Sequence, residues 1–350
     1  MKYIPQTFAL LLLAQAPLSH AGLFDALKGD GSPVYTSKLD KLDGNKALAL
    51  GGFQVTFLLN TKDSAIAKNT NLFGRQASSD YAQVGMNAKL EGVPEALMQQ
   101  ITDAAFADLV SDLEKRGYTV YTQQQLGQSD AWGRLKFKGS PSYAANAMNQ
   151  GVNLTSMLGG LAKSAMSSDP QQVTFAPTGM GINTSPTGVG AYGNVAKELG
   201  APVVMARYEV NFATFAKDTD FSINYLKNMP NQVGPSMNYE ASINLNQAIS
   251  VTPGASLSFA TGKSGINHIP EVKLNAPVVV GGAYGEISDT TSGASKFANA
   301  LSSTLGAFSG KTSTAAERTI TANPVYFEVG ALKALDEANN RLVAELPVVN

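Results

Sequence analysis

The chain contains no cysteine and only two histidines, and these absences exclude several kinds of chemistry. Without cysteine there is no disulfide, no thiol nucleophile and no lipid-modified cysteine of the kind that anchors bacterial lipoproteins. Zinc and transition-metal sites usually take two or more histidine or cysteine ligands. His268 lies in the loop-like sequence GINHIPE, where a structural or solvated role is the simpler interpretation. We therefore predict no catalytic residue, no metal site and no cofactor site from these residue types.

Charge is also scarce, since 15% of the residues are charged and the formal net charge is −1. Such a chain has no global field to attract nucleic acid or an anionic membrane surface. We therefore expect no nucleic-acid partner. An apolar content of 44% is too high for a disordered chain and predicts a folded core.

The N-terminus has the three parts of a secretory signal. Lys2 supplies the positive region, residues 8–14 (FALLLLA) form a short apolar region, and Ser19 and Ala21 are the small residues of a cleavage site. The apolar run is far shorter than the roughly 20 residues of a membrane-spanning helix. We predict a signal peptide over 1–21, cleaved after Ala21, and export to the periplasm, the outer membrane or the exterior.

Hydrophobic periodicity predicts an α/β (α+β) domain in which helices cover a mixed sheet. Apolar residues at i+4 predict a helix over 94–116 that ends at Gly117, with a solvated face carrying Asp108 and Asp112. Alternation predicts a long amphipathic β-hairpin over 238–260 whose first strand projects beyond its sheet. Further strands are expected at 47–60, 84–90, 118–122, 202–216 and 276–282, and helices at 123–136, 191–199, 295–308 and 324–346. In the last of these helices, Val325 and Val329 are assigned to the buried stripe.

The remaining segments look less regular. We expect residues 22–45 to be a flexible segment and 46–350 to be a single α/β domain. Gly/Ser-rich stretches interrupt that domain, and we interpret them as insertions at about 139–190 and 261–317, the first with a weak apolar helix near 152–166. Asp218 and Asp220 are interpreted as turn residues.

Two motifs resemble cofactor-binding or metal-binding sequences, but the residues around them argue against these roles. Residues 188–193 have the glycine spacing of a dinucleotide-binding loop, and Glu209 follows, but the loop comes after a Pro/Gly/Ser linker instead of a strand. Asp40 and Asp43 lack the alternating ligands of a calcium-binding hand. The sequence does not decide whether a catalytic carboxylate pair or Ser/Lys dyad is present, because the partners in such pairs can lie far apart in the chain.

The order of elements is similar to that of the curli-secretion-channel family of bacterial outer-membrane proteins. The likeness is clearest in AAFADLVSDLEKRGYTVYTQQQL (104–126), in GAPVVMARYEV (200–210) and in YEASINLNQAISVTPGASLSF (239–259). The resemblance implies an α/β core related to the N-terminal domain of the Tol-system propeller protein. It also implies an oligomeric outer-membrane channel to which each subunit contributes two β-hairpin inserts, here at about 216–238 and 261–293.

Three functional hypotheses follow. The first is an exported, non-enzymatic cell-envelope protein that acts through self-association or through an envelope protein partner. Its contact with the outer membrane would be peripheral or mediated by β elements. The second is a secreted ligand-binding module. The third is a hydrolase that uses carboxylate or Ser/Lys chemistry.

Overall fold

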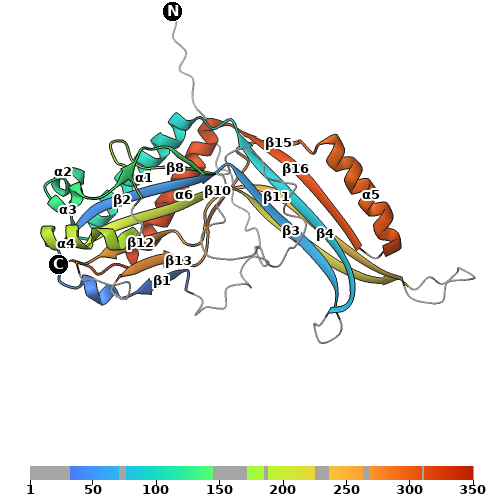
Figure 1. Cartoon of the computed structure of the whole chain (residues 1–350), viewed down its shortest axis with the longest axis horizontal. Helices are drawn as coiled ribbons and strands as arrows, with labels where there is room; N and C mark the ends of the chain where they lie inside the picture. Colours follow the sequence, from blue (N-terminus) through green and yellow to red (C-terminus); the bar gives the residue numbers. More distant parts are fainter. Residues whose placement is uncertain are drawn as a thin grey trace, which may run out of the picture.

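The computed structural model describes residues 32–70, 76–144, 172–184, 188–224, 236–262, 269–309 and 311–349. The predicted signal peptide, the predicted helix at 152–166 and His268 lie outside these ranges. A large mixed sheet and a second sheet share the chain, and helices pack on both, which confirms the predicted α/β class (Figure 1).

The large sheet forms the body of the molecule. Its strand order is β1-β13-β12-β10-β2-β8-β7, with β5 beside β2, and β11 beside β10 and β14. The strand bounds are β1 Val34–Ser37, β2 Ala47–Leu58, β5 Thr119–Tyr121, β7 Ser142–Ala144, β8 Gln172–Phe175, β10 Val203–Asn224, β11 Ser236–Val251, β12 Ser256–Ala260, β13 Glu271–Leu274 and β14 Val278–Gly281. A separate two-stranded pair joins β6 Phe137–Lys138 to β9 Ile182–Asn183.

Two long helices cover one face of this sheet (Figure 1). They are α1 Glu95–Lys115 and α6 Pro324–Ala344, and their small and aliphatic residues join the strands in one buried core. α6 can lie close to the sheet because Gly330 has no Cβ, which would otherwise meet the Cδ1 atom of Ile249 at 2.6 Å. The predicted apolar stripe of α1, from Leu97 to Leu113, is buried as expected.

Short helices cover part of the opposite face. They are α2 Gln123–Leu126, α3 Asp130–Gly133, the 3-10 helix η4 Gly188–Tyr192 and α4 Gly193–Leu199, and a smaller cluster around Tyr192 and Met205 packs beneath them. α4 ends at Gly200, whose φ of 64° is the left-handed conformation that glycine accepts without strain.

The second sheet has the strand order β15-β16-β4-β3 and, together with α5 Gly293–Ser309, extends away from the body (Figure 1). Its strands are β3 Asn60–Thr70, β4 Gln76–Glu91, β15 Gly285–Asp289 and β16 Lys311–Ala322. Only Leu59 separates β2 of the large sheet from β3 of the second sheet. The chain therefore passes directly from the body into this extension.

Several sequence predictions were wrong in this part of the chain. Within residues 309–323, expected as a linker in and after an insertion, Lys311–Ala322 form β16, and β3 was not predicted at all. Asp218 and Asp220 are not turn residues but lie within the 22-residue strand β10. Within the supposed insertion at 139–190, β7 and β8 complete the large sheet.

Two further corrections concern the body. Of the segment expected to be flexible, β1 pairs with β13, and the 3-10 helix η1 Leu39–Leu42 buries Leu42. In α6, Val325 and Val329 are 63% and 62% exposed, whereas the buried stripe begins at Phe327. Val325 and Val329 therefore lie on the exposed side of α6 and not in its buried stripe.

Candidate interaction surface

The extension seen in Figure 1 is built from two layers, and we call it the arm. One layer is the outer part of the β10–β11 hairpin, where residues 213–224 pair with 236–247 after the pairing of β10 with β2 has ended at Val210. The other layer is the second sheet. The first strand of the predicted hairpin, β11, therefore does project beyond the body, although it pairs over most of its length with β10.

A small set of apolar residues joins the two layers, and we call it the arm core. Ala65 and Met86 from the second sheet pack against Ile243 of β11, with Phe215 and Leu245 at their side. An ion pair of 2.6 Å between Lys217 Nζ on β10 and Asp63 Oδ1 on β3 also joins the layers. Over the described residues the arm core is much smaller than the body core, so each of its apolar contacts matters more to the arm.

Helix α5 covers one edge of the second sheet. β15 pairs with β16 only from Arg318 to Ala322, so the part of β16 before residue 318 has no strand on that side among the described residues. The side chain of Asn299 replaces the missing strand at Ala315, because its Nδ2 donates to Ala315 O at 2.6 Å and its Oδ1 accepts from Ala315 N–H at 2.9 Å. This amide forms the same pair of bonds that a neighbouring strand would form.

Two hydroxyl side chains bond the backbone of β16 at the positions two residues before and two residues after Ala315. Thr291 Oγ1 accepts from Glu317 N–H at 2.9 Å and donates to Glu317 O at 3.2 Å. Ser302 Oγ accepts from Ser313 N–H at 3.0 Å. We call the backbone of residues 313, 315 and 317 the β16 edge. Polar side chains, together with Thr290 N–H, which donates to Glu317 O at 3.1 Å, thus bond three alternate residues of an edge that otherwise could add a strand.

The start of α5 is anchored by Asp289. Its carboxylate contacts Arg318 Nη1 at 2.5 Å and Lys296 Nζ at 3.6 Å, and Oδ1 accepts from Thr291 N–H at 3.0 Å. The hydrogen bonds from Thr291 are the main cause that lowers the pKa of Asp289 to about 2. Asp289 is therefore ionised at neutral pH and holds Thr291 at the β16 edge.

The outward side of α5 and the first turn of α6 expose apolar side chains. Phe297 is 71% exposed, and Val325, Tyr326 and Val329 are each more than 60% exposed. Lys296 is the one charged residue in the α5 sequence. Val325, Tyr326 and Val329 lie together on the first two turns of α6, and such groups of exposed apolar residues are typical of interaction surfaces.

A polar cavity of about 480 Å³ lies on a part of the large sheet that none of the described helices covers, lined by residues that include Gln54, Arg207, Glu209 and Thr252. Thr252 Oγ1 donates to Glu209 Oε1 at 3.1 Å. Burial raises the pKa of the Glu209 carboxyl, and the bond from Thr252 partly opposes that shift. Glu209 lies within β10. It therefore does not act as the acidic partner of a dinucleotide-binding loop at residues 188–193.

The raised pKa of Glu209 predicts that its ionised carboxylate lowers the free energy of unfolding at neutral pH. A carboxyl whose pKa is higher in the folded protein stabilises it below the unfolded pKa, and that contribution is lost as the pH rises through the folded pKa. Glu209→Gln, which can still accept from Thr252, should raise the free energy of unfolding at pH 7 by up to about 1 kcal/mol and leave it unchanged near pH 4. Urea unfolding at both pH values measures this, with the exposed Glu345→Gln as control. Equal stabilisation at both pH values would contradict the assignment.

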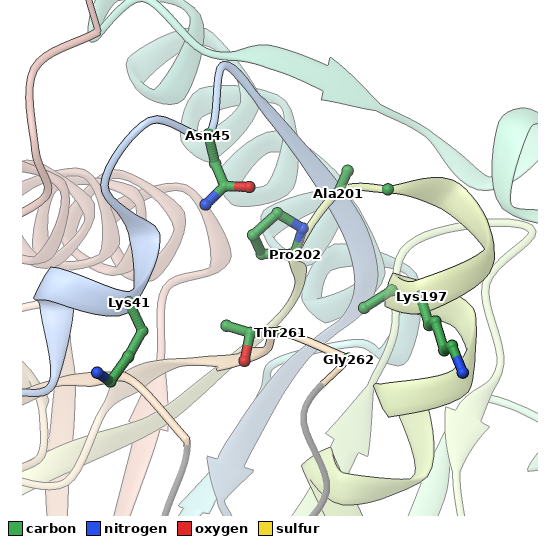
Figure 2. Close-up of a pocket in the computed structure, with 9 residues that line it drawn as sticks. Lys41, Asn45, Lys197, Ala201, Pro202, Thr261 and Gly262 are labelled. Carbon is green, nitrogen blue, oxygen red and sulfur yellow. The ribbon is translucent and has the colours of Figure 1, made fainter.

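A second cavity, of about 420 Å³, lies where the end of α4 meets β10 and the end of β12 (Figure 2). In Figure 2, Asn45, Pro202 and Thr261 surround its centre, whereas the side chains of Lys41 and Lys197 lie toward its periphery. Thr261 Oγ1 is buried and has no hydrogen-bond partner in the part of the chain that the structure describes, and Lys41 Nζ contacts Asp40 Oδ2 at 3.1 Å. Asp40 and Asp43, weighed earlier as calcium ligands, belong to η1 and its C-cap.

The acids of α1 are not the solvated face that the sequence predicted. Asp112 is 7% exposed, and its Oδ1 accepts from Lys115 at 2.9 Å. Asp108 Oδ2 accepts from Asn339 of α6 at 2.9 Å. These carboxylates lie near the contact between α1 and α6. The helical period of the sequence could not predict this polar network, because it does not show which helix packs beside α1.

Comparisons with family models, with curated proteins and with solved structures find no match to this chain. The resemblance to the curli-secretion-channel family therefore stays a prediction. No group of three or more His, Cys, Asp or Glu in the described residues is arranged to hold a metal ion. Over the same residues, no helix is long and apolar enough to cross a membrane.

Proposed function

We propose that the mature chain is an exported, non-enzymatic cell-envelope protein that acts by assembly, and that the arm is the surface through which copies associate. The observation that carries the proposal is the arm itself. It extends long paired strands away from a well-packed body. Among the described residues its core is small, and the first turns of its covering helix expose Phe297.

The architecture of the second sheet supports association between identical copies. Its two ends differ, since β3 forms one end and β15 with β16 forms the other. A contact between different ends of the same sheet is head-to-tail, and such contacts generate rings or filaments. The exposed apolar residues of α5 and α6 supply additional surface next to this sheet.

The test uses two residues of equal exposure on different parts of the molecule. Ile66 on β3 of the arm and Val279 on β14 of the body are each 40% exposed. Ile66→Asp should weaken association at least about tenfold, because a desolvated carboxylate at a contact is costly. Val279→Asp should change association little. Light scattering over a range of concentrations measures the molar mass of residues 22–350 and of both variants.

A protein that stays monomeric at all concentrations, or one in which both variants behave alike, would contradict the proposal.

The secreted ligand-binding module is a second candidate because the uncovered face of the large sheet carries the polar cavity around Glu209. A rise in melting temperature with a small polar ligand, lost in Arg207→Ala, would favour that function.

A further inference from the structure

Helix α5 occupies the β16 edge by imitating a strand, and we propose that β3 of a second copy displaces it and pairs with that edge. This inference rests on the proposed assembly function and names the strands that would join. Three observations carry it: the polar attachment of α5, the orientation of the edge of β3 that no described strand covers, and the relative direction of the two strands.

The attachment of α5 to β16 is made with polar groups that an incoming strand would supply equally well. Asn299, Thr291 and Ser302 bond the backbone of residues 315, 317 and 313. On the same helix Phe297 is 71% exposed, and Ala294 and Ala298 are also exposed. Because these apolar side chains remain in solvent, hydrophobic burial by them does not hold this described part of the helix in place, and an incoming strand could replace its polar bonds to β16.

β3 has one edge that no described strand covers, and on that edge Ser64 N–H donates to Asp63 Oδ1 at 2.8 Å, a side-chain bond that an incoming strand would replace. β3 pairs only with β4 among the described strands, in the antiparallel register Asn60↔Lys89. One position earlier, Leu90 N–H donates to Leu59 O at 2.9 Å. Bonded and non-bonded pairs alternate in an antiparallel ladder, so residues 61, 63, 65 and 67 bond β4. The backbone of residues 62, 64 and 66 therefore points away from β4, and we call these residues the β3 edge.

The side chains of the two edges lie on matching faces. Ala65 and Ala67 face the arm core at 2% and 6% exposure, whereas Ile66 on the alternate side is 40% exposed. On β16, Ala316 packs on the arm core, whereas residues 313, 315 and 317 are exposed. Both edges thus belong to residues that carry their side chains on the outer face, as directly opposed residues of one sheet must.

The strand directions fit an antiparallel pair. β16 runs parallel to β4, and β3 runs antiparallel to β4. If two copies are related by a rotation about an axis along the strands, β3 of one copy meets β16 of the next in the antiparallel sense. The second sheets of neighbouring copies would then continue as one sheet, with the arm cores on the same side.

The first test uses the absence of native cysteine. Two chains, one with Ser64→Cys on the β3 edge and one with Ala315→Cys on the β16 edge, are mixed and oxidised, so that every mixed disulfide is intermolecular. Ser313→Cys and Glu317→Cys replace Ala315→Cys in turn to cover the neighbouring registers. Ser142→Cys is the matched control for Ser64→Cys, because Ser142 is also a half-buried serine on a terminal strand. At least one β16 position should give several-fold more mixed disulfide with the Ser64→Cys chain than with the Ser142→Cys chain.

The second test loosens α5 without touching either pairing strand. Asn299→Ala removes both bonds to Ala315 and should raise the association constant about five- to tenfold, together with the yield of mixed disulfide. Asn340→Ala is the control, since Asn340 is an exposed helical asparagine whose side chain bonds only within α6, to Asp336 Oδ1. Light scattering and non-reducing gels give the two readouts.

The outcomes separate this inference from the function on which it rests. Mixed disulfides at the β16 edge, increased by Asn299→Ala, support both. Association without preferred disulfides between the two edges, or association that Asn299→Ala leaves unchanged, overturns the exchange of α5 for β3 but leaves assembly standing. A wild-type chain and an Asn299→Ala chain that both stay monomeric overturn both proposals.

Discussion

Replacing Asn339 by alanine is expected to lower the free energy of unfolding by about 3 kcal/mol, because the side chain connects three structural elements in the body core. Asn339 is completely buried on α6. Its Oδ1 accepts from Tyr208 Oη of β10 at 2.6 Å, and its Nδ2 donates to Ala105 O and Asp108 Oδ2 of α1 at 3.1 and 2.9 Å. Alanine would leave the buried Tyr208 hydroxyl and the Asp108 carboxylate without this partner.

Urea unfolding of the two single variants and their combination tests this network. Tyr208→Phe should cost about 1–2 kcal/mol, since it leaves only Asn339 Oδ1 without a donor. The double variant should cost less than the sum of the single variants, because the bond between the two residues can be lost only once. Asn340→Ala, the next residue on α6, should stay within about 0.5 kcal/mol of the wild type. Additive losses would show that Tyr208 and Asn339 do not act together.

Ile243→Asp is expected to disrupt the arm while the body stays folded. Ile243 is 6% exposed and packs with Ala65 and Met86 between the two layers. An aspartate there loses apolar burial and places a carboxylate in the arm core, at a combined cost of about 3–5 kcal/mol. Among the described residues the arm core has few others to compensate for that loss, and Ile243 belongs to neither cluster of the body core, although its neighbours Phe215 and Leu245 also pack against the larger one.

Two measurements distinguish a local effect from global unfolding. Limited proteolysis should cut the Ile243→Asp variant first within 60–91 and 285–322, and the main unfolding transition of the body should remain. The association constant should fall about a hundredfold, in line with the loss of an ordered arm. Asn244→Asp places the same charge on the exposed neighbouring residue and should preserve both properties. If Ile243→Asp abolishes the transition of the body as well, the arm and body do not fold as separable units.

The elements that the sequence predicts well are those with a strong apolar period. α1 and β11 each bury one regular face, so their residues alternate clearly between core and solvent. The Gly200 turn and the α5 helix were also predicted near their observed bounds. In these segments the local pattern and the tertiary packing agree.

The arm was predicted poorly because its strands bury few large side chains. β3 presents Ala65 and Ala67 to the arm core, and the β16 sequence is rich in Thr, Ser and Ala. Small residues give little alternation in hydropathy, so the periodicity that indicates a strand is weak there. Asp218 and Asp220 were misinterpreted for a related reason, since β10 continues beyond the body on pairing with β11 rather than on burial.

The interactions at the β16 edge could not be predicted from the sequence, because they depend on which elements meet. The side chain of Asn299 bonds a strand that follows it in the chain, and no spacing rule connects Asn299 with Ala315. Likewise, the period of α6 shows that Val325 and Val329 share a side of the helix but not that this side is exposed. Periodicity defines a face, whereas only the fold decides what covers it.

Hydrogen exchange of the wild-type mature chain at low and high concentration tests the account most directly, because it shows which amides become protected on association. Assembly through the arm predicts new protection in residues 60–91 and 285–322, and little change in the strands and helices of the body. Protection that appears only in the body, or exchange that is independent of concentration, would contradict it.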